Sequence, residues 1–279
     1  MKIGVSSYSF SKYMKATGAG YVDVCDKAKE LGFDGIEFIG LVGDDHIAIA
    51  KEIRAHCEKI GLPIIAYTVG ANLLADDIEA EVARLKSCVD VCEALGAPLM
   101  RHDVASKLRP IHMYSYADAI VEMAPRIREV TEYAEMKGIR TCSENHGFIF
   151  QAPEIVEELI LAVGHKNYGW LCDMGNFLCV DADPAEAVYI AAPYAFHVHA
   201  KDFLFKPGTE PAPAGFGLVT GGGNYLRGTI VGHGVVPVRQ CVNILKRAGY
   251  DGWLSLEFEG TEDNITALEQ GLTFLRSCI

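Results

Sequence analysis

The sequence predicts a single α/β domain over residues 1–279, folded as an eight-stranded (β/α) barrel. Three observations predict it. Short β-rich runs alternate with longer helical patterns eight times over, which is typical of a parallel barrel inside a ring of helices. Glycine follows several helical patterns just before the next β-rich run, as short connections require. The length of 279 residues is also common for one barrel.

The individual elements follow from these patterns. Strands are expected near residues 3–8, 35–39, 63–69, 98–103, 140–145, 169–174, 195–201 and 253–259. Helices are expected near residues 21–32, 46–61, 77–95, 117–138, 152–163, 183–190, 237–248 and 262–277. The glycines expected to end helices are Gly32, Gly61, Gly96, Gly138 and Gly249.

One segment breaks the alternation. Residues 203–236 follow the seventh predicted strand and are rich in Gly and Pro, which predicts a long loop. Long loops after barrel strands lie over the carboxyl-terminal face, so this one is expected to shape the active site. The alternative is a flexible surface insertion with no part in the site.

Composition excludes several classes of protein. The net charge of −12 disfavours general binding to nucleic acid. Nine cysteines without a CxxC pair indicate free thiols in a reducing compartment, and neither a secretory signal nor a membrane-spanning run is visible. A cytoplasmic protein is therefore expected. Neither a GxGxxG motif nor a P-loop occurs, so no nucleotide cofactor is expected.

Alternation along the strands points four ligand-type side chains inward. In the run 253–259 the apolar residues alternate with Glu257, and the same reasoning turns His199 inward in the run 195–201. In the fifth strand Cys142, Glu144 and His146 share one parity, and Asp173 lies at the end of the sixth strand. Carboxylates this close together would repel, and a divalent cation would neutralise them. Alternatively, each is separately hydrogen-bonded or solvated.

Five motifs then resemble a known family. The sequence is similar to the xylose isomerase-like TIM barrels, which include sugar-phosphate isomerases and epimerases, ketose 3-epimerases and hydroxypyruvate isomerases. The motifs are SENHG at 143–147, LCDMGN at 171–176, HVHAKD at 197–202, GTIVGHG at 228–234 and LSLEFEG at 254–260. The resemblance spans the whole chain and is strongest from residue 140 onward. It points to the superfamily, whereas the substrate is left open.

The resemblance implies a metal site and a reaction. Glu144, Asp173, His199 and Glu257 would hold one divalent cation, and this oxygen-rich set favours Mn²⁺, with Mg²⁺, Co²⁺ or Zn²⁺ as the other candidates. In related ketose epimerases the residues that match Glu144 and Glu257 also form the acid/base pair. The expected activity is isomerisation or epimerisation of a sugar or sugar phosphate through a cis-enediolate, with either glutamate as the base.

Further residues are expected to contact the substrate. Asn176 stands where many relatives have a histidine, so the substrate of the ketose epimerases does not transfer directly, and a trinuclear metal site is disfavoured. His146 is a candidate contact or a packed neighbour of the site, and Lys201 could bind a substrate oxygen or pair with Glu259. The remaining candidates are Glu37, His102 and His233, and the two histidines could instead bind additional metal.

Other functions stay open at this point. A dehydratase or lyase acting on a cyclic polyol or an oxidised sugar needs the same metal and one general base. Phosphodiester hydrolysis, as in the apurinic endonucleases of this superfamily, would need three metals and a basic groove. A sugar-binding barrel without catalysis is a fourth reading. The expected partner is a small carbohydrate, with a homodimer or homotetramer as a possible assembly.

Overall fold

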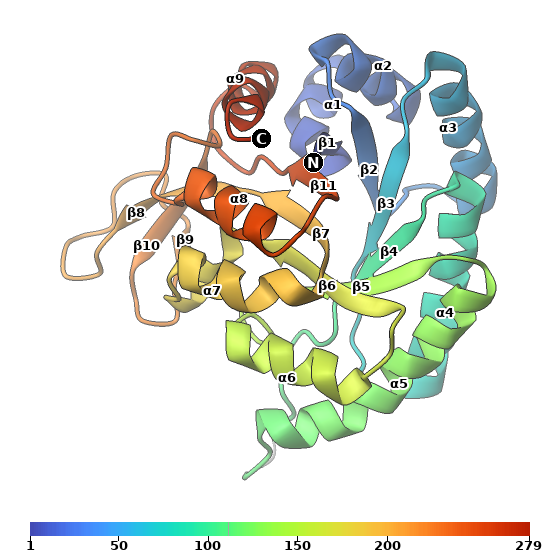
Figure 1. Cartoon of the computed structure of the whole chain (residues 1–279), viewed down its shortest axis with the longest axis vertical. Helices are drawn as coiled ribbons and strands as arrows, with labels where there is room; N and C mark the ends of the chain where they lie inside the picture. Colours follow the sequence, from blue (N-terminus) through green and yellow to red (C-terminus); the bar gives the residue numbers. More distant parts are fainter. Residues whose placement is uncertain (111) are drawn as a thin grey trace.

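Eight parallel strands close into a barrel in the computed structural model, which describes residues 1–110 and 112–279 (Figure 1). Each strand pairs with the next along the chain, and the last pairs with both the first and the seventh. The predicted fold is thereby confirmed. The barrel strands are β1 (Lys2–Ser6), β2 (Gly35–Ile39), β3 (Ile64–Val69), β4 (Leu99–His102), β5 (Arg140–Glu144), β6 (Tyr168–Asp173), β7 (Ala195–Ala200) and β11 (Trp253–Leu256).

The helices surround this barrel, and the eight predicted ones begin and end within two residues of their predicted positions (Figure 1). They are α2 (Tyr21–Leu31), α3 (His46–Ile60), α4 (Ile78–Leu95), α5 (Tyr116–Met136), α6 (Pro153–Val163), α7 (Pro184–Ala191), α8 (Val238–Arg247) and α9 (Asn264–Arg276). The five predicted glycines lie at or just after helix ends with positive φ, as Gly32 shows at 91°. Carboxylate caps such as Asp77, which accepts from the amide of Ala80, begin several of these helices.

The first predicted strand ends early. It runs only to Ser6, whose hydroxyl accepts a hydrogen bond from the amide of Tyr8 and so begins the short 3₁₀ helix η1 (Ser7–Phe10). The helix α1 (Ser11–Thr17), which the sequence pattern did not predict, follows directly. Two further 3₁₀ helices, η2 (Asn176–Val180) and η3 (Ala192–Tyr194), flank α7.

The barrel interior is layered. Its packed middle layer holds four buried inward residues from neighbouring strands, with Phe196 packed against them, and these are Ala66, Leu99, Cys142 and Leu171. Two residues further along the same strands, the inward positions are polar, and they are Thr68, Arg101, Glu144 and Asp173. Since successive inward side chains differ by two residues, the apolar layer seals the barrel beneath a polar carboxyl-terminal layer.

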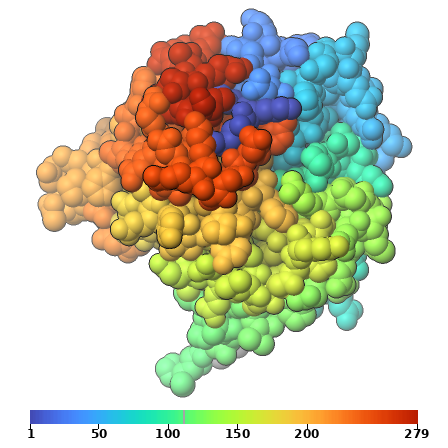
Figure 2. Space-filling view, viewed as in Figure 1, coloured from blue at the N-terminus to red at the C-terminus, as the bar shows by residue number. Residues whose placement is uncertain are grey.

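The predicted long connection after the seventh barrel strand is present, and it contains strands that its composition did not predict. It contributes most of a three-stranded antiparallel sheet, in the order β8 (Asp202–Lys206), β10 (Tyr225–Thr229), β9 (Leu218–Val219). Figure 2 shows this sheet as a lobe that projects from the side of the barrel. Phe203 and Leu226 bury their side chains against Cys179, which gives the sheet a small core of its own.

Two carboxylates fasten this segment to the barrel. Asp202 accepts hydrogen bonds from the amides of Gly232, Gly234 and Val236, each at 2.9–3.0 Å. Asp181, at the end of η2, accepts from the hydroxyl of Thr220 and the side-chain amide of Asn224. These hydrogen bonds favour an ordered segment over a flexible insertion.

Within the part of the chain that the structure describes, no helix combines the length and apolar character needed to cross a membrane.

Candidate metal centre and its pocket

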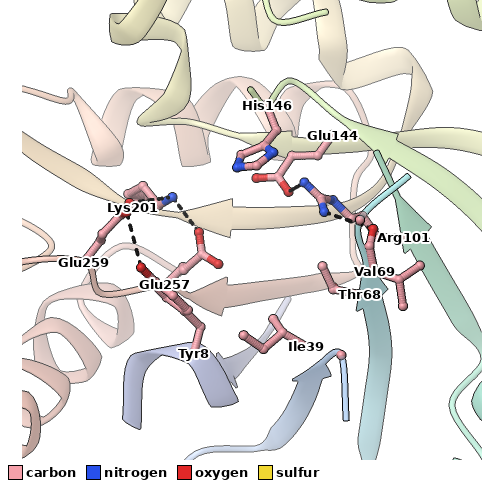
Figure 3. Close-up of a pocket in the computed structure, with 12 residues that line it drawn as sticks. Tyr8, Ile39, Thr68, Val69, Arg101, Glu144, His146, Lys201, Glu257 and Glu259 are labelled. Carbon is pink, nitrogen blue, oxygen red and sulfur yellow. Dashed lines mark hydrogen bonds and ion pairs between the residues drawn. The ribbon is translucent and has the colours of Figure 1, made fainter. Parts of the chain in front are cut away.

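A cavity of about 410 Å³ opens at the carboxyl-terminal ends of the barrel strands (Figure 3). Its walls come from the ends of six barrel strands and from η1. The residues that line it are Tyr8, Ile39, Gly40, Thr68, Val69, Gly70, Arg101, Glu144, His146, Lys201, Glu257 and Glu259. None of these belongs to 203–236, so among the described residues that segment does not shape this pocket, contrary to the expectation.

The four predicted ligands meet at one point beside this cavity. One side-chain donor atom from each of Glu144, Asp173, His199 and Glu257 lies within 4.8 Å of the others. From Nδ1 of His199, the distances are 3.5 Å to Glu144 Oε1, 3.9 Å to Asp173 Oδ2 and 3.6 Å to Glu257 Oε2. Three of the side chains are buried, and that of Glu257 is 12% exposed toward the pocket.

These residues fit a divalent cation. Asp173 Oδ2 and His199 Nδ1 are both buried, and neither has a hydrogen-bond partner among the described residues. Buried polar atoms without partners are costly, and a cation placed between them would satisfy both. Three carboxylates and one imidazole form a hard, oxygen-rich donor set of the kind that Mn²⁺ and Mg²⁺ accept.

Lys201 adds a fixed positive charge beside the same cluster. Its Nζ lies 2.6 Å from Glu257 Oε2 and 3.2 Å from Glu259 Oε2 (Figure 3). The distance from Nζ to Asp173 Oδ2 is 3.5 Å. Lys201 was predicted either to bind a substrate oxygen or to pair with Glu259. Its position is compatible with both, because it pairs with Glu259 and also faces the cavity. The ammonium therefore offsets part of the carboxylate charge at this centre.

Arg101 is the residue of this pocket that sequence reasoning missed. Its guanidinium lies 2.6 Å from Glu144 Oε2 and 2.8 Å from Asp103 Oδ1, with the side chain only 5% exposed. The strand run gave no signal for it, because Leu99 and Met100 are both apolar and leave the parity undetermined. Pairing of β4 with β5 decides the matter by aligning Arg101 with inward Cys142.

Charge and burial shift the pKa values of this cluster in opposite directions. Burial raises the pKa of the Asp173 carboxyl to about 7. Burial would raise that of Glu144 too, but the neighbouring Arg101 and His199 lower its pKa to about 2. For His199, burial favours the neutral ring, whereas Glu37, Glu257 and Glu144 together hold its pKa well above the ordinary value.

Glu37, predicted as a substrate contact, lies beneath the centre and is not among the residues that line the cavity. Its carboxylate is fully buried, with Oε2 2.6 Å from His197 Nε2 and Oε1 2.7 Å from His199 Nε2. A carboxylate on the far nitrogen of an imidazole fixes the orientation of the ring. Glu37 therefore leaves Nδ1 of His199 facing the other three ligands.

Two asparagines support the ligands. Asn145 accepts hydrogen bonds from the Asp173 amide and from Trp170 Nε1, and it donates to the Asp173 carbonyl, so it fixes the end of β6. Asn176 donates to Glu144 Oε1 at 3.1 Å and accepts from Lys201 at 3.3 Å. The predicted Asn176 thus lies at the site, and Asn145 is a positioning residue that the motif SENHG contained without marking it.

Of the remaining predicted histidines, one lines the cavity and two lie outside it. His146 lines the cavity, and its Nδ1 lies 2.9 Å from Asp103 Oδ1. His102 is wholly buried, stacks on Tyr168 and does not line the cavity, since β4 presents Arg101 there instead. His233 is exposed on the segment after β10 and is also outside the cavity. Neither His102 nor His233 therefore lines the cavity, and neither is among the grouped ligand atoms.

The fold agrees with the comparisons. The chain belongs to the xylose isomerase-like TIM barrel family, whose model matches residues 25–278. A relative, the rhizopine catabolism protein MocC of Rhizobium meliloti, is 24% identical over 249 residues, which cover 83% of this chain and 72% of that protein. The resemblance stated from the motifs is thereby confirmed.

Solved structures share the fold. The xylose isomerase domain protein from Planctomyces limnophilus has a TM-score of 0.78 at 20% identity, with 99% of this chain and 96% of that chain covered. The probable 3-DHS dehydratase AsbF from Bacillus anthracis has a TM-score of 0.75 at 20% identity, with 99% of each chain covered. D-Psicose 3-epimerase from Clostridium cellulolyticum H10, solved with D-tagatose, has a TM-score of 0.75 at 18% identity, with 100% and 99% covered.

Proposed function

We propose that this chain is a divalent-metal-dependent sugar isomerase or epimerase. The observation that carries the proposal is the convergence of four ligand-type atoms within 4.8 Å beside a cavity of about 410 Å³. That volume suits a monosaccharide. The structural likeness to a sugar epimerase of the same fold supports the reaction class.

Glu144, Asp173, His199 and Glu257 would hold the cation, with Mn²⁺ preferred and Mg²⁺ next. When bound, the metal polarises the carbonyl and the adjacent hydroxyl of a ketose, so that the neighbouring C–H becomes acidic. Glu37 fixes the His199 ring, and Asn145 fixes the backbone of Asp173. The ligand set is therefore held in place before any cation or substrate arrives.

The chain itself supplies the proton transfers. Glu144 comes from β5 and Glu257 from just beyond β11, and both carboxylates line the cavity. One removes a proton beside the carbonyl to give a cis-enediolate, and the other returns a proton to the neighbouring carbon or to the opposite face. Arg101 and Lys201 hold these carboxylates in place.

The test combines metal exchange with a panel of ketoses in deuterium oxide. The protein is stripped with a chelator, reloaded with Mn²⁺, and compared with its Glu144→Gln and Glu257→Gln variants. We expect solvent deuterium in the product and a fall in kcat of about 10²–10⁴-fold for each variant, since each loses one proton carrier. Glu58→Gln, at an exposed pair with Arg54, is the matched control. Variants as active as the parent would contradict the acid/base assignment.

Elimination is the second candidate, and the likeness to a probable dehydratase supports it. Removal of the same proton followed by loss of a β-hydroxyl would use one glutamate as base and the other as acid. A cyclic polyol or an oxidised sugar included in the panel separates the two reactions. Isomerisation conserves the mass of the substrate apart from deuterium, whereas elimination lowers it by one water.

A further inference from the structure

Anions bind to barrels of this kind at recognisable places. Backbone N–H groups converge in the loops that follow the seventh and eighth barrel strands, and these commonly hold a phosphate. Arginine and lysine side chains in the pocket supply the other means of binding a phosphate or carboxylate. In this chain, carboxylates of the protein itself occupy both kinds of position.

The glycine-rich turn after β10 is filled by Asp202. One carboxylate oxygen, Oδ2, accepts from the amides of Gly232 and Gly234 at 2.9 Å each, and Oδ1 accepts from Val236 at 3.0 Å. The approach is so close that a Cβ added at Gly234 would lie 2.2 Å from Asp202 Oδ1. Because Asp202 is buried, no external anion can share these amides.

The cationic side chains of the cavity are also paired. Arg101 contacts Glu144 at 2.6 Å and Asp103 at 2.8 Å, and Asp103 also contacts His146 at 2.9 Å. Lys201 contacts Glu257 at 2.6 Å and Glu259 at 3.2 Å. Among the described residues that line the cavity, Arg101 and Lys201 are the lysine and arginine side chains, and each has carboxylate partners, as does the His146 imidazole.

The other walls carry no charge that would attract an anion. The cavity is also lined at the ends of β2 and β3 by Ile39, Gly40, Thr68, Val69 and Gly70. Figure 3 shows Ile39, Thr68 and Val69 across the cavity from Lys201. At the rim, the Glu259 side chain is 36% exposed, which presents a negative charge to any entering ligand. A dianion would therefore meet repulsion at the rim and find no unpaired cationic side chain within.

We propose that the pocket selects an uncharged carbohydrate and excludes phosphorylated and carboxylated ones, with Glu259 as the specificity-determining residue whose carboxylate, together with that of Glu257, occupies the Lys201 ammonium. The proposal names the substrate class for the proposed sugar chemistry and rests on that function for the carbohydrate itself. Exclusion of anions rests only on the ion pairs and hydrogen bonds of this pocket. Glu259 is suited to the role because it is not one of the four grouped ligands.

The test measures anion binding by calorimetry on the Mg²⁺-loaded protein at fixed ionic strength, with sulfate as the dianion probe. We expect no binding to the parent at up to about 10 mM sulfate. Glu259→Gln keeps an oxygen for the Tyr8 hydroxyl and removes the one carboxylate partner of Lys201 that is not among the four grouped ligands, so the affinity for sulfate should rise roughly fivefold or more. Glu210→Gln removes the same charge from the pair with Lys206 on the projecting sheet and should bind sulfate like the parent.

Matched pairs of ketoses and ketose phosphates complete the experiment. The unphosphorylated ketose should be the better competitor or substrate for the parent. In Glu259→Gln the preference for the ketose over its phosphate should be smaller. Millimolar sulfate binding to the parent, preference for the phosphate, or no gain in Glu259→Gln over Glu210→Gln would each overturn the proposal. If no ketose is turned over, the proposed function fails, and the sulfate titration still decides whether anions are excluded.

Discussion

Arg101 is a buried cation that links two carboxylates at the mouth of the barrel. Its guanidinium contacts Glu144 and Asp103, and its side chain is 5% exposed. A buried carboxylate is tolerated only where a partner compensates for the water it has lost. Arg101 thus lets Glu144 stay ionised at a position where burial alone would favour the neutral acid.

Replacement of Arg101 should therefore destabilise the metal-free protein. Arg101→Met leaves Glu144 buried without its cation, and we expect the free energy of unfolding in urea to fall by about 3–5 kcal/mol. Saturation with a divalent cation should reduce this loss, because the cation would neutralise Glu144 in its place. Arg54→Met is the matched control, since its pair with Glu58 is exposed and its loss should cost less than about 0.5 kcal/mol. Equal effects of the two substitutions would contradict this account of Arg101.

Alternation predicted the direction of single residues only where the strand was amphipathic. Leu254, Leu256 and Phe258 are buried as the pattern required, and Glu257 faces the cavity. In β4, where apolar residues occupy both parities, the pattern favoured His102 and missed Arg101. In β4 each parity has one apolar and one polar side chain, so polarity does not tell the inward face from the outward one. Only the pairing with β5 distinguishes these two faces of the strand.

Asp202 holds a whole segment of backbone in place, whereas Arg101 holds single side chains. Its carboxylate accepts hydrogen bonds from the amides of Phe203, Gly232, Gly234 and Val236, and so ties the turn that follows β10 to the start of β8. A turn so rich in glycine has high conformational entropy when unfolded, and it loses that entropy on folding. The hydrogen bonds to the Asp202 carboxylate offset this loss and keep the turn ordered.

Removal of this carboxylate should loosen one segment and leave the barrel intact. Asp202→Ala is expected to lower the free energy of unfolding by about 1–3 kcal/mol, since buried amides lose their acceptor. Hydrogen exchange should accelerate at residues 230–236 and stay unchanged in β3 and β4. Asp181→Ala serves as the comparison, because it should accelerate exchange at 220–224 instead. A uniform acceleration across the barrel would mean that Asp202 supports the whole fold.

Helices were more predictable than the strands inserted after β7. Asp77 and Gly96 mark the two ends of α4, and such local signals act whatever the rest of the chain does. The sheet of β8, β9 and β10 depends instead on long-range pairing, in which Leu226 lies opposite Phe205 and Leu218. Gly and Pro between these short strands conceal them, since a two-residue strand has no periodicity to detect.

Closure of the barrel assembles the centre from distant parts of the chain. Glu37 on β2 contacts His197 on β7 across 160 residues of sequence, and the four grouped ligands come from strands five to eight of the barrel. Their mutual repulsion opposes closure unless positive charge is present. Binding of a cation to the folded barrel should therefore stabilise the whole molecule.

Metal loading should raise the melting temperature. At about 100 times its Kd, a cation that binds only the folded state adds about 2.7 kcal/mol. For a chain of this size, that corresponds to a rise of about 5–10 °C in Tm. Asp173→Asn should show no rise in Tm and no bound metal by elemental analysis. Asp181→Asn, away from the grouped ligands, should keep the rise in Tm and the bound metal. A rise that persists in Asp173→Asn would place the cation elsewhere.

The sequence by itself determined the barrel, the order of its elements and the parity of Glu257 and His199, because hydrophobic periodicity and helix-ending residues are local properties. Tertiary structure alone decided that Arg101 faces the cavity, that Glu37 lies beneath His199, and that residues 203–236 form a sheet beside the pocket. Each of these depends on which strands lie next to one another. Contacts between residues far apart in the chain are set by closure of the barrel, and no local pattern records them.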